Sequence, residues 1–354
     1  MAASQRVLGH PDVMPLIAEF QKGLYLDILE YWRKVTHDGG TEFWATLDLP
    51  PHAIDRRLLG SPTQNRHQLL VLVAANQLHL VRRLLRCRPY FLTQPDSPAV
   101  MDIAAAFGRV ELVRYFHTIS SQTALCSTRA MDLAAKYGYM DIVHFLHHHR
   151  QEGCTAAAMV GAAAHGHLKI VRFLHEHRTE GCTADAMDYA STNGHLDVVA
   201  FLVASRHEGC STWAMDTAAG AGRMDVVRFL HFHVKSACTI DAMNASAANG
   251  HLEVVRFLHF HRQEGCTRRA MDMAAKNGHY NVVKFLHEHR REGCTEYALH
   301  GAAQNGHVTI VQFLVRYRNE GNLVKAIEVA KVHGHVHCAA VLQTVARSLT
   351  PLAC

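Results

Sequence analysis

Seven cysteines of this chain lie at a constant distance from one another. They occupy positions 126, 154, 182, 210, 238, 266 and 294, so that each gap spans 28 residues. Glycine recurs with the same period from Gly138 to Gly334, and phenylalanine recurs from Phe145 to Phe313. A period of about 20–50 residues is typical of solenoids and related arrays, in which similar units stack on one another. The period therefore predicts a stacked repeat protein over most of the chain.

Each unit carries the pattern of two helices. Thr183 stands where a hydroxyl can cap the first helix of its unit, and Gly194 stands where a left-handed residue can end it. The second helix has an apolar arc that is wide enough to contact its partner helix and both adjacent units, as in Leu252, Val254, Val255, Phe257 and Leu258. The fold class that we predict is all-α: an elongated helix-turn-helix solenoid with an N-terminal helical cap.

The best-preserved unit resembles the ankyrin repeat. From Ala247 to Leu258 it reads Ala-Ala-Asn-Gly-His-Leu-Glu-Val-Val-Arg-Phe-Leu, and the resemblance covers roughly 97–345. Ankyrin repeats are about 33 residues long, whereas the units here have 28 and open with x-Ala-Met-Asp. Successive units are joined by Glu-Gly-Cys-Thr, a segment that is too short to form a projecting β-hairpin. The resemblance implies protein binding on the concave side, which would here fall mainly on the first helices.

Four segments are expected along the chain. Residues 1–65 do not repeat, 66–96 hold a degenerate first repeat, 97–345 hold the ankyrin-like array, and 346–354 form a C-terminal tail. In the first segment Ile17, Phe20, Leu24, Ile28 and Trp32 fall at helical spacing. This segment is expected to cover the first exposed unit as a cap. The alternative is a docking module, which would make the protein an adaptor for a larger complex such as a ubiquitin ligase.

Composition indicates a protein of a reducing compartment. No window approaches 18 uninterrupted apolar residues, the first residues lack the pattern of a signal peptide, and ten cysteines without such a signal are expected to be thiols. Equivalent cysteines of stacked units would lie about 8–10 Å apart, beyond the roughly 7 Å that a disulfide spans. We therefore expect buried, reduced cysteines in a cytoplasmic monomer with no membrane contact, the nucleus remaining an alternative.

The 29 histidines fall into three main columns. One column follows the turn glycine, and two close the second helix, where charged imidazoles suit the helix dipole. The two within one helix are separated by about 200° of turn, so they cannot face one metal ion. His144 and His148 have suitable spacing but no third ligand beside them. No metal or other cofactor is expected, although imidazoles that gain charge between about pH 5 and 7 would give the array a pH-dependent stability.

An acidic column recurs in the first helices, at Asp102, Asp132, Asp188, Asp216 and Asp272. These carboxylates stand where the ankyrin histidine makes hydrogen bonds between repeats, so the resemblance implies a structural tie instead of a catalytic pair. Val160 and His300 interrupt the column. The sequence contains no glycine-rich phosphate loop, nucleophile elbow or Cys-x-x-Cys, and no enzymatic activity is predicted.

Nucleic-acid binding is the alternative from a different class. Arg172, Arg228, Arg256 and Lys284 form a basic column on the second helices, and the net charge is only +5. The column is interrupted by Ala200 and Gln312. A polyanion would reveal itself by a steep salt dependence of binding. We do not expect nucleic acid as the main partner.

The positions that vary between units predict where a partner binds. They lie on the first helix at its second, sixth and ninth residues, and this spacing places them on one helix face. We predict protein binding, by an unidentified protein or an extended peptide, at Arg129, Leu133, Tyr189, Trp213, Arg269, Met273 and Tyr297. Tryptophan, tyrosine and arginine dominate interface hot spots, and small neighbours such as Gly161, Ala245 and Gly301 are expected to leave room for side chains of the partner. The alternative is a solvated face that is free to drift.

A second apolar spot is expected on the second helices. Phe232 and Phe260 occupy a column that elsewhere holds His148, Glu176, Glu288 and Arg316, and they should be neighbours in the stack. In the same region Val234-Lys235-Ser236-Ala237 replaces the usual Arg-x-Glu-Gly. This irregular segment marks either a bend or a contact point.

Overall fold

The computed structural model describes residues 67–87, 89–92, 99–119 and 125–349. Every regular element in these ranges is a helix, and none of the described residues forms a strand, which confirms the predicted all-α fold. The chain divides into two compact units, Met1–Cys182 and Thr183–Cys354. The cap or docking module expected at 1–65, with its helical pattern from Ile17 to Trp32, lies outside the described residues.

The first unit consists of consecutive helix pairs. Its earliest pair falls within the expected degenerate repeat, and the pair is followed by a short 3-10 helix. The elements are α5 (His67–Ala74), α6 (Leu78–Cys87), η2 (Pro89–Leu92), α7 (Val100–Ala106), α8 (Val110–Ile119), α9 (Thr128–Lys136), α10 (Met140–His149), α11 (Ala156–Ala164) and α12 (Leu168–His177).

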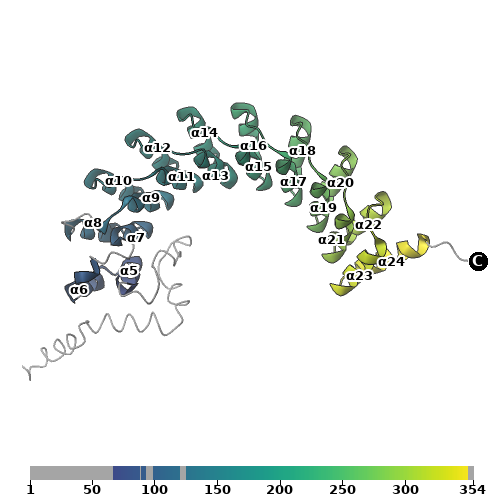
Figure 1. The fold of residues 1–354 in the computed structure, drawn as a ribbon, viewed down its shortest axis with the longest axis horizontal. Coiled ribbons are helices and arrows are strands. Elements are labelled where there is room, and N and C mark those ends of the chain that lie inside the picture. Colours follow the sequence, from purple (N-terminus) through teal and green to yellow (C-terminus); the bar gives the residue numbers. More distant parts are fainter. Residues whose placement is uncertain (1–66, 88, 93–98, 120–124, 350–354) are drawn as a thin grey trace, which may run out of the picture. The chain divides into compact units, whose positions relative to one another are not determined.

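The second unit continues the same alternation (Figure 1). Within it the first helices line one side of the stack and the second helices line the other. The elements are α13 (Asp185–Asn193), α14 (Leu196–Ser205), α15 (Thr212–Gly220), α16 (Met224–Phe229), η4 (Leu230–Val234), α17 (Ile240–Ala248), α18 (Leu252–His261), α19 (Arg268–Lys276), α20 (Tyr280–His289), α21 (Glu296–Gln304), α22 (Val308–Tyr317), α23 (Leu323–Val332) and α24 (Val336–Leu349). Helix α24 therefore continues beyond 345, where the tail was expected to begin.

Small residues allow the first helices to approach one another closely. In α15, Ala214 and Ala218 are completely buried, and Met215 between them is buried as well. The second helices present larger groups to the core, such as Val254, Val255 and Leu258 in α18. The alternation of small and large residues lets adjacent helices interdigitate at the density of a normal protein interior.

Hydroxyl side chains cap five of the first helices in the described ranges. The side chains of Ser127, Thr155, Ser211, Thr239 and Thr295 each accept a hydrogen bond from a backbone amide of the first turn.

The prediction that Thr183 caps its helix is wrong. The Thr183 hydroxyl donates to Oδ2 of Asp185 at 2.9 Å. Helix α13 begins at Asp185, and its capping residue, Ala184, has no side-chain acceptor. Gly194 does end this helix in the left-handed conformation, at φ 84°.

The turn glycines have two reasons to be glycine. Gly138 has a φ of 85°, where a side chain is strained. A Cβ at this position would also lie 2.6 Å from the imidazole of His167, the first residue after the next turn. The same approach recurs at later turns, and Tyr139 and Arg223 replace the histidine over Gly108 and Gly194. The histidine that follows each turn is therefore a packing residue of the scaffold.

Candidate functional site

The acidic column ties each repeat to the cap of the next. Asp272 accepts hydrogen bonds from the backbone amide of Thr295 at 2.7 Å and from its hydroxyl at 2.8 Å, one on each carboxylate oxygen. The same arrangement joins Asp102 to Ser127, Asp132 to Thr155, Asp188 to Ser211, and Asp216 to Thr239. These carboxylates are thus engaged in structure, as predicted.

Burial makes one of these ties unusual. Asp102 is almost fully buried, and burial raises the pKa of its carboxyl above the ordinary value, against the opposing hydrogen bonds from Ser127. His300, which interrupts the column, is buried too, and its Nε2 lies 3.3 Å from the carbonyl oxygen of Asn322. The histidine thus reaches the next repeat through a single, longer contact, in which its ring nitrogen donates instead of accepting.

An Arg–Glu pair holds most of the short connections between repeats, and the sequence argument missed it. Arg178 and Glu180 form an ion pair two residues apart, and the guanidinium also hydrogen-bonds the thiol of Cys154 in the preceding unit. Glu180 reaches the backbone amide of Cys154 at 3.4 Å. The pair recurs as Arg150–Glu152, Arg206–Glu208, Arg262–Glu264, Arg290–Glu292 and Arg318–Glu320. The repeated Arg-x-Glu was the signal that could have revealed it.

The cysteine ladder consists of free thiols in the described part of the chain. Burial is the main cause that raises the pKa of Cys126 to about 12 and the pKa of Cys154, Cys238, Cys266 and Cys294 to about 11. A thiol with so high a pKa has little thiolate at neutral pH and reacts slowly. Cys126, Cys154, Cys238 and Cys294 are buried, as expected, whereas Cys182, Cys210 and Cys266 are half-buried.

The histidines that close the second helices pack against phenylalanine. The ring of His261 stacks on Phe257 of its own helix at a centroid distance of 4.3 Å, and its Nδ1 lies 3.0 Å from the Phe257 carbonyl oxygen. His231, one unit earlier, meets the same Phe257 edge-on at 5.4 Å. The two columns thus join successive units through aromatic contacts. No group of three potential metal ligands occurs among the described residues.

The variable positions of the first helices partly pack against each other, which corrects one expectation. A Cβ on Gly301 would lie 2.8 Å from Cβ of Lys276 in the preceding first helix, and Gly161 stands in the same relation to Lys136 at 2.9 Å. These glycines therefore do not leave room for a partner, because the lysine stem of the neighbouring repeat fills the space.

The same complementarity applies at the other small positions. A Cβ on Gly220 would lie 2.9 Å from Cβ of Ala245, so Ala245 too faces its neighbouring repeat. Where both residues are larger, Thr192 and Thr217 share a hydrogen bond of 2.6 Å between their hydroxyls. Part of the variation along this face is therefore paired between repeats.

Two aromatic residues of the same face are exposed and touch each other. Tyr189 in α13 is 42% exposed and Trp213 in α15 is 45% exposed. Their ring centroids lie 5.4 Å apart at an interplanar angle of 90°. An edge-to-face pair of this kind is favourable and holds both rings in place at the surface.

The other predicted binding residues lie on three further first helices. Arg129 is exposed and Leu133 is half-buried in α9 of the first unit. In the second unit Arg269 is exposed and Met273 is half-buried in α19, and Tyr297 in α21 is 70% exposed.

Phe232 and Phe260 are the most exposed phenylalanines of the second helices, at 57% and 62%. Each ring meets the following unit: Phe232 lies 6.1 Å from Phe257, and Phe260 lies 6.5 Å from Phe285.

The irregular segment from Val234 to Ala237 begins at the end of a π-helical turn, η4, which contains Phe232 and is capped by a left-handed Lys235 with φ 53°. Here Ser236 replaces the Arg–Glu pair and accepts the Cys210 thiol proton at 3.4 Å.

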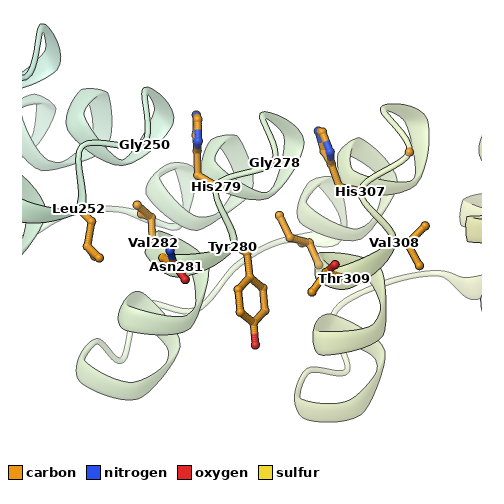
Figure 2. Close-up of a pocket in the computed structure, with 12 residues that line it drawn as sticks. Gly250, Leu252, Gly278, His279, Tyr280, Asn281, Val282, His307, Val308 and Thr309 are labelled. Carbon is orange, nitrogen blue, oxygen red and sulfur yellow. The ribbon is translucent and has the colours of Figure 1, made fainter.

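A groove of about 710 Å³ opens at the turns of three repeats in the second unit. Figure 2 shows the imidazoles of His279 and His307 on one side of it and the ring of Tyr280 pointing the other way. Nε2 of His307 lies 3.0 Å from the carbonyl oxygen of Lys276, and Tyr280 meets Phe313 edge-on at 5.7 Å. These side chains are thus engaged in joining repeats.

Comparison with known protein families matches the repeat region. Residues 131–216 match the family described as ankyrin repeats (3 copies), and residues 245–287 and 271–315 match ankyrin repeats (many copies). No curated protein gives a significant match to the chain. Together with the helix pairs, these matches show that the matched region is built of ankyrin repeats. Ankyrin repeats are protein–protein interaction modules, and they are generally non-catalytic.

No helix among the described residues is long and apolar enough to cross a bilayer.

Proposed function

We propose that this protein is a non-catalytic scaffold that binds a protein partner on the first-helix face of its repeats. The observation that carries the proposal is the exposed Tyr189–Trp213 pair. Large aromatic groups bury much area at a small cost in side-chain entropy, so they act as anchors in interfaces. Arg129, Leu133, Arg269, Met273 and Tyr297 are proposed as further contacts on the same kind of face.

The engagement of the other columns supports this choice of face. The acids, the turn histidines and the Arg–Glu pairs are all occupied in joining repeats. The two aromatic rings, in contrast, contact each other and leave a large part of their surface to solvent. Contiguous exposed apolar surface on a folded protein commonly marks an interaction site.

The experiment is affinity capture with the double variant Tyr189→Ala/Trp213→Ala beside the wild type. Loss of hot-spot aromatics costs at least about 2 kcal/mol of binding free energy each, so captured partners should disappear while the midpoint of unfolding stays nearly unchanged. The matched control is His207→Ala, which removes an exposed ring from a loop of the same unit. Retention of all partners by the double variant would refute the proposed face, and a large loss of stability would place the two rings in the core.

Two narrower readings remain proposals. An adaptor that docks a larger complex through residues 1–65 would lose that complex when the segment is deleted. Nucleic-acid binding through Arg172, Arg228, Arg256 and Lys284 would show as a steep salt dependence. The free, high-pKa thiols support a reducing compartment, and we propose the cytoplasm, with a protein or extended peptide as the partner of a monomer.

A further inference from the structure

The first helices of the second unit differ in charge from one end of the unit to the other. Helices α13, α15 and α17 carry only acidic charged side chains, which are Asp185, Asp188, Asp216 and Asp241. Helices α19, α21 and α23 carry mostly basic ones, namely Arg268, Arg269, Lys276, Lys325 and Lys331, beside Asp272, Glu296 and Glu328. One end of this face therefore favours anionic ligands, whereas the other end repels them.

A cavity of about 440 Å³ opens at the basic end, between α19, α21 and α23. Arg269, Lys276 and Lys325 line it, one or two from each of the outer helices. Met273 and Tyr297 contribute apolar surface to the same opening. Basic and apolar groups thus line one opening, where Asp272 and Gln304 are also present, and a mixture of apolar surface with a few charged groups is common in binding sites.

The packing of the repeats holds Lys276 at this opening. Its stem lies against Gly301, where a Cβ would come within 2.8 Å of the lysine Cβ and 3.1 Å of its Cγ. The residue as a whole is nevertheless exposed, so that its ammonium group reaches solvent. A stem that is already packed loses less conformational entropy when the ammonium group binds.

The acidic groups near the cavity are engaged by the fold. Both carboxylate oxygens of Asp272 accept hydrogen bonds from Thr295. Glu296 lies 3.8 Å from the ammonium nitrogen of Lys325, and both side chains are about half exposed. An exposed pair of this kind is weak, so a carboxylate of a ligand can replace Glu296 at Lys325.

We infer that this cavity binds an acidic, extended peptide segment of the partner. Carboxylates of the segment pair with Arg269, Lys276 and Lys325, and an apolar side chain between them packs against Met273 and Tyr297. The inference rests on the proposed function and adds the chemistry of the partner.

Nucleic acid is disfavoured at the same place. A polyanion that follows the first-helix face would continue onto α17 and α15, where Asp241 and Asp216 repel phosphates. A peptide can end its acidic run at the boundary between α19 and α17, but a phosphate backbone has a charge at each step.

The test uses short fluorescein-labelled peptides of one length in which leucine and tyrosine alternate with glutamate, with glutamine or with lysine. Fluorescence anisotropy with the full chain measures their affinities at low and physiological salt, beside a labelled single-stranded DNA. The glutamate peptide should bind on the order of tenfold more tightly than the glutamine peptide, since each exposed ion pair contributes a small amount. The lysine peptide and the DNA should bind more weakly still.

The variant Arg269→Gln/Lys276→Gln/Lys325→Gln should remove the preference for glutamate. The matched control Arg228→Gln/Arg256→Gln/Lys284→Gln removes the same charge from exposed positions of the second helices and should retain it. Unfolding midpoints check that both variants are folded, and the comparison of peptides on the wild type needs no variant at all. Equal affinity for the glutamate and glutamine peptides, or DNA binding that depends on the same three residues, would overturn the inference.

The two proposals fail separately. Tyr189→Ala/Trp213→Ala lies on the acidic end and should leave binding of the glutamate peptide unchanged. If the protein binds the glutamate and glutamine peptides equally while the double variant still loses its captured partner, the proposal of an acidic segment is refuted and the proposed function stands. If the peptide result holds while the double variant captures all partners, the cavity is the interaction site and the aromatic pair is not.

Discussion

At the scale of single residues, the column that contains Asp272 and Asn244 binds the cap of the next repeat through either a carboxylate or an amide. Asp272 accepts two hydrogen bonds from Thr295 on separate oxygens, whereas Asn244 uses a single oxygen for both bonds from Thr267, at 3.0 and 3.3 Å. Charged acceptors make shorter and stronger hydrogen bonds than neutral ones. The asparagine therefore makes the weaker tie. Burial does not explain the difference, because Asp188 is buried to a similar extent and makes the stronger, charged tie to Ser211.

The exchange Asn244→Asp should raise the free energy of unfolding by about 1 kcal/mol at pH 7, because it supplies a second, charged acceptor for Thr267. The converse change, Asp272→Asn, should lower it by a similar amount. Urea unfolding followed by circular dichroism measures both. If Asn244→Asp proves destabilising, the cost of burying a carboxylate at this position exceeds the gain from its hydrogen bonds.

At the scale of the helix, the second helices combine core packing with histidines whose charge is disfavoured. Nδ1 of His147, His231 and His259 is buried and has no hydrogen-bond partner in the described ranges. Burial, followed by nearby cations, lowers the pKa of these imidazoles below 6.5. For His259 the neighbouring cations are Arg290 and His289, which Glu292 opposes.

These helices should lose stability in mild acid. A histidine with a lowered pKa in the folded state binds fewer protons than it does in the unfolded chain, so the free energy of unfolding falls as pH drops through about 6.5. Urea unfolding at pH 7.5 and 5.5 measures this loss. The variant His147→Gln/His231→Gln/His259→Gln should show a smaller loss, and His207→Gln, in an exposed loop, should behave as the wild type. Equal stability of the wild type at the two pH values would contradict the prediction.

At the scale of the whole molecule, the connections between repeats replace the projecting hairpins of longer ankyrin units. An Arg–Glu pair over the thiol of the preceding unit closes the short segment, and the pair recurs in both compact units. The connection after η4 is the exception, because Ser236 takes the place of the glutamate and contacts Cys210 directly. In both forms the connection contacts a cysteine of the preceding unit.

The cysteine ladder should resist modification in the native protein. Raising the pKa of Cys154, Cys238, Cys266 and Cys294 to about 11 from 9.0 lowers their thiolate content by roughly a hundredfold. Iodoacetamide at pH 8 should therefore label these positions slowly in the native state and rapidly in guanidinium, and peptide mapping by mass spectrometry resolves each site. Rapid native labelling of the four thiols would show that the connections open readily.

Much of the scaffold could be predicted from sequence because its causes are local or periodic. The hydroxyl at Thr295 and the glycine at Gly138 act within a few residues, and the tie from Asp272 was implied by the resemblance to the ankyrin repeat. Thr183 shows the limit of such reasoning, since the nearby Asp185 takes its hydroxyl proton and the helix begins later. The location of the exposed aromatic pair was also foreseen, whereas its binding role stays a prediction.

By itself, the sequence determined the period, the two-helix unit and the positions of its turns, because hydrophobic periodicity and turn chemistry are written in consecutive residues. Only the tertiary structure decided which variable residues face solvent. Lys276 and Gly301 stand in different repeats, and their fit arises only when two helices stack at close range. The same stacking gathers Arg269, Lys276 and Lys325 around one cavity. No single repeat contains that site, because its groups come from three helices that meet through packing.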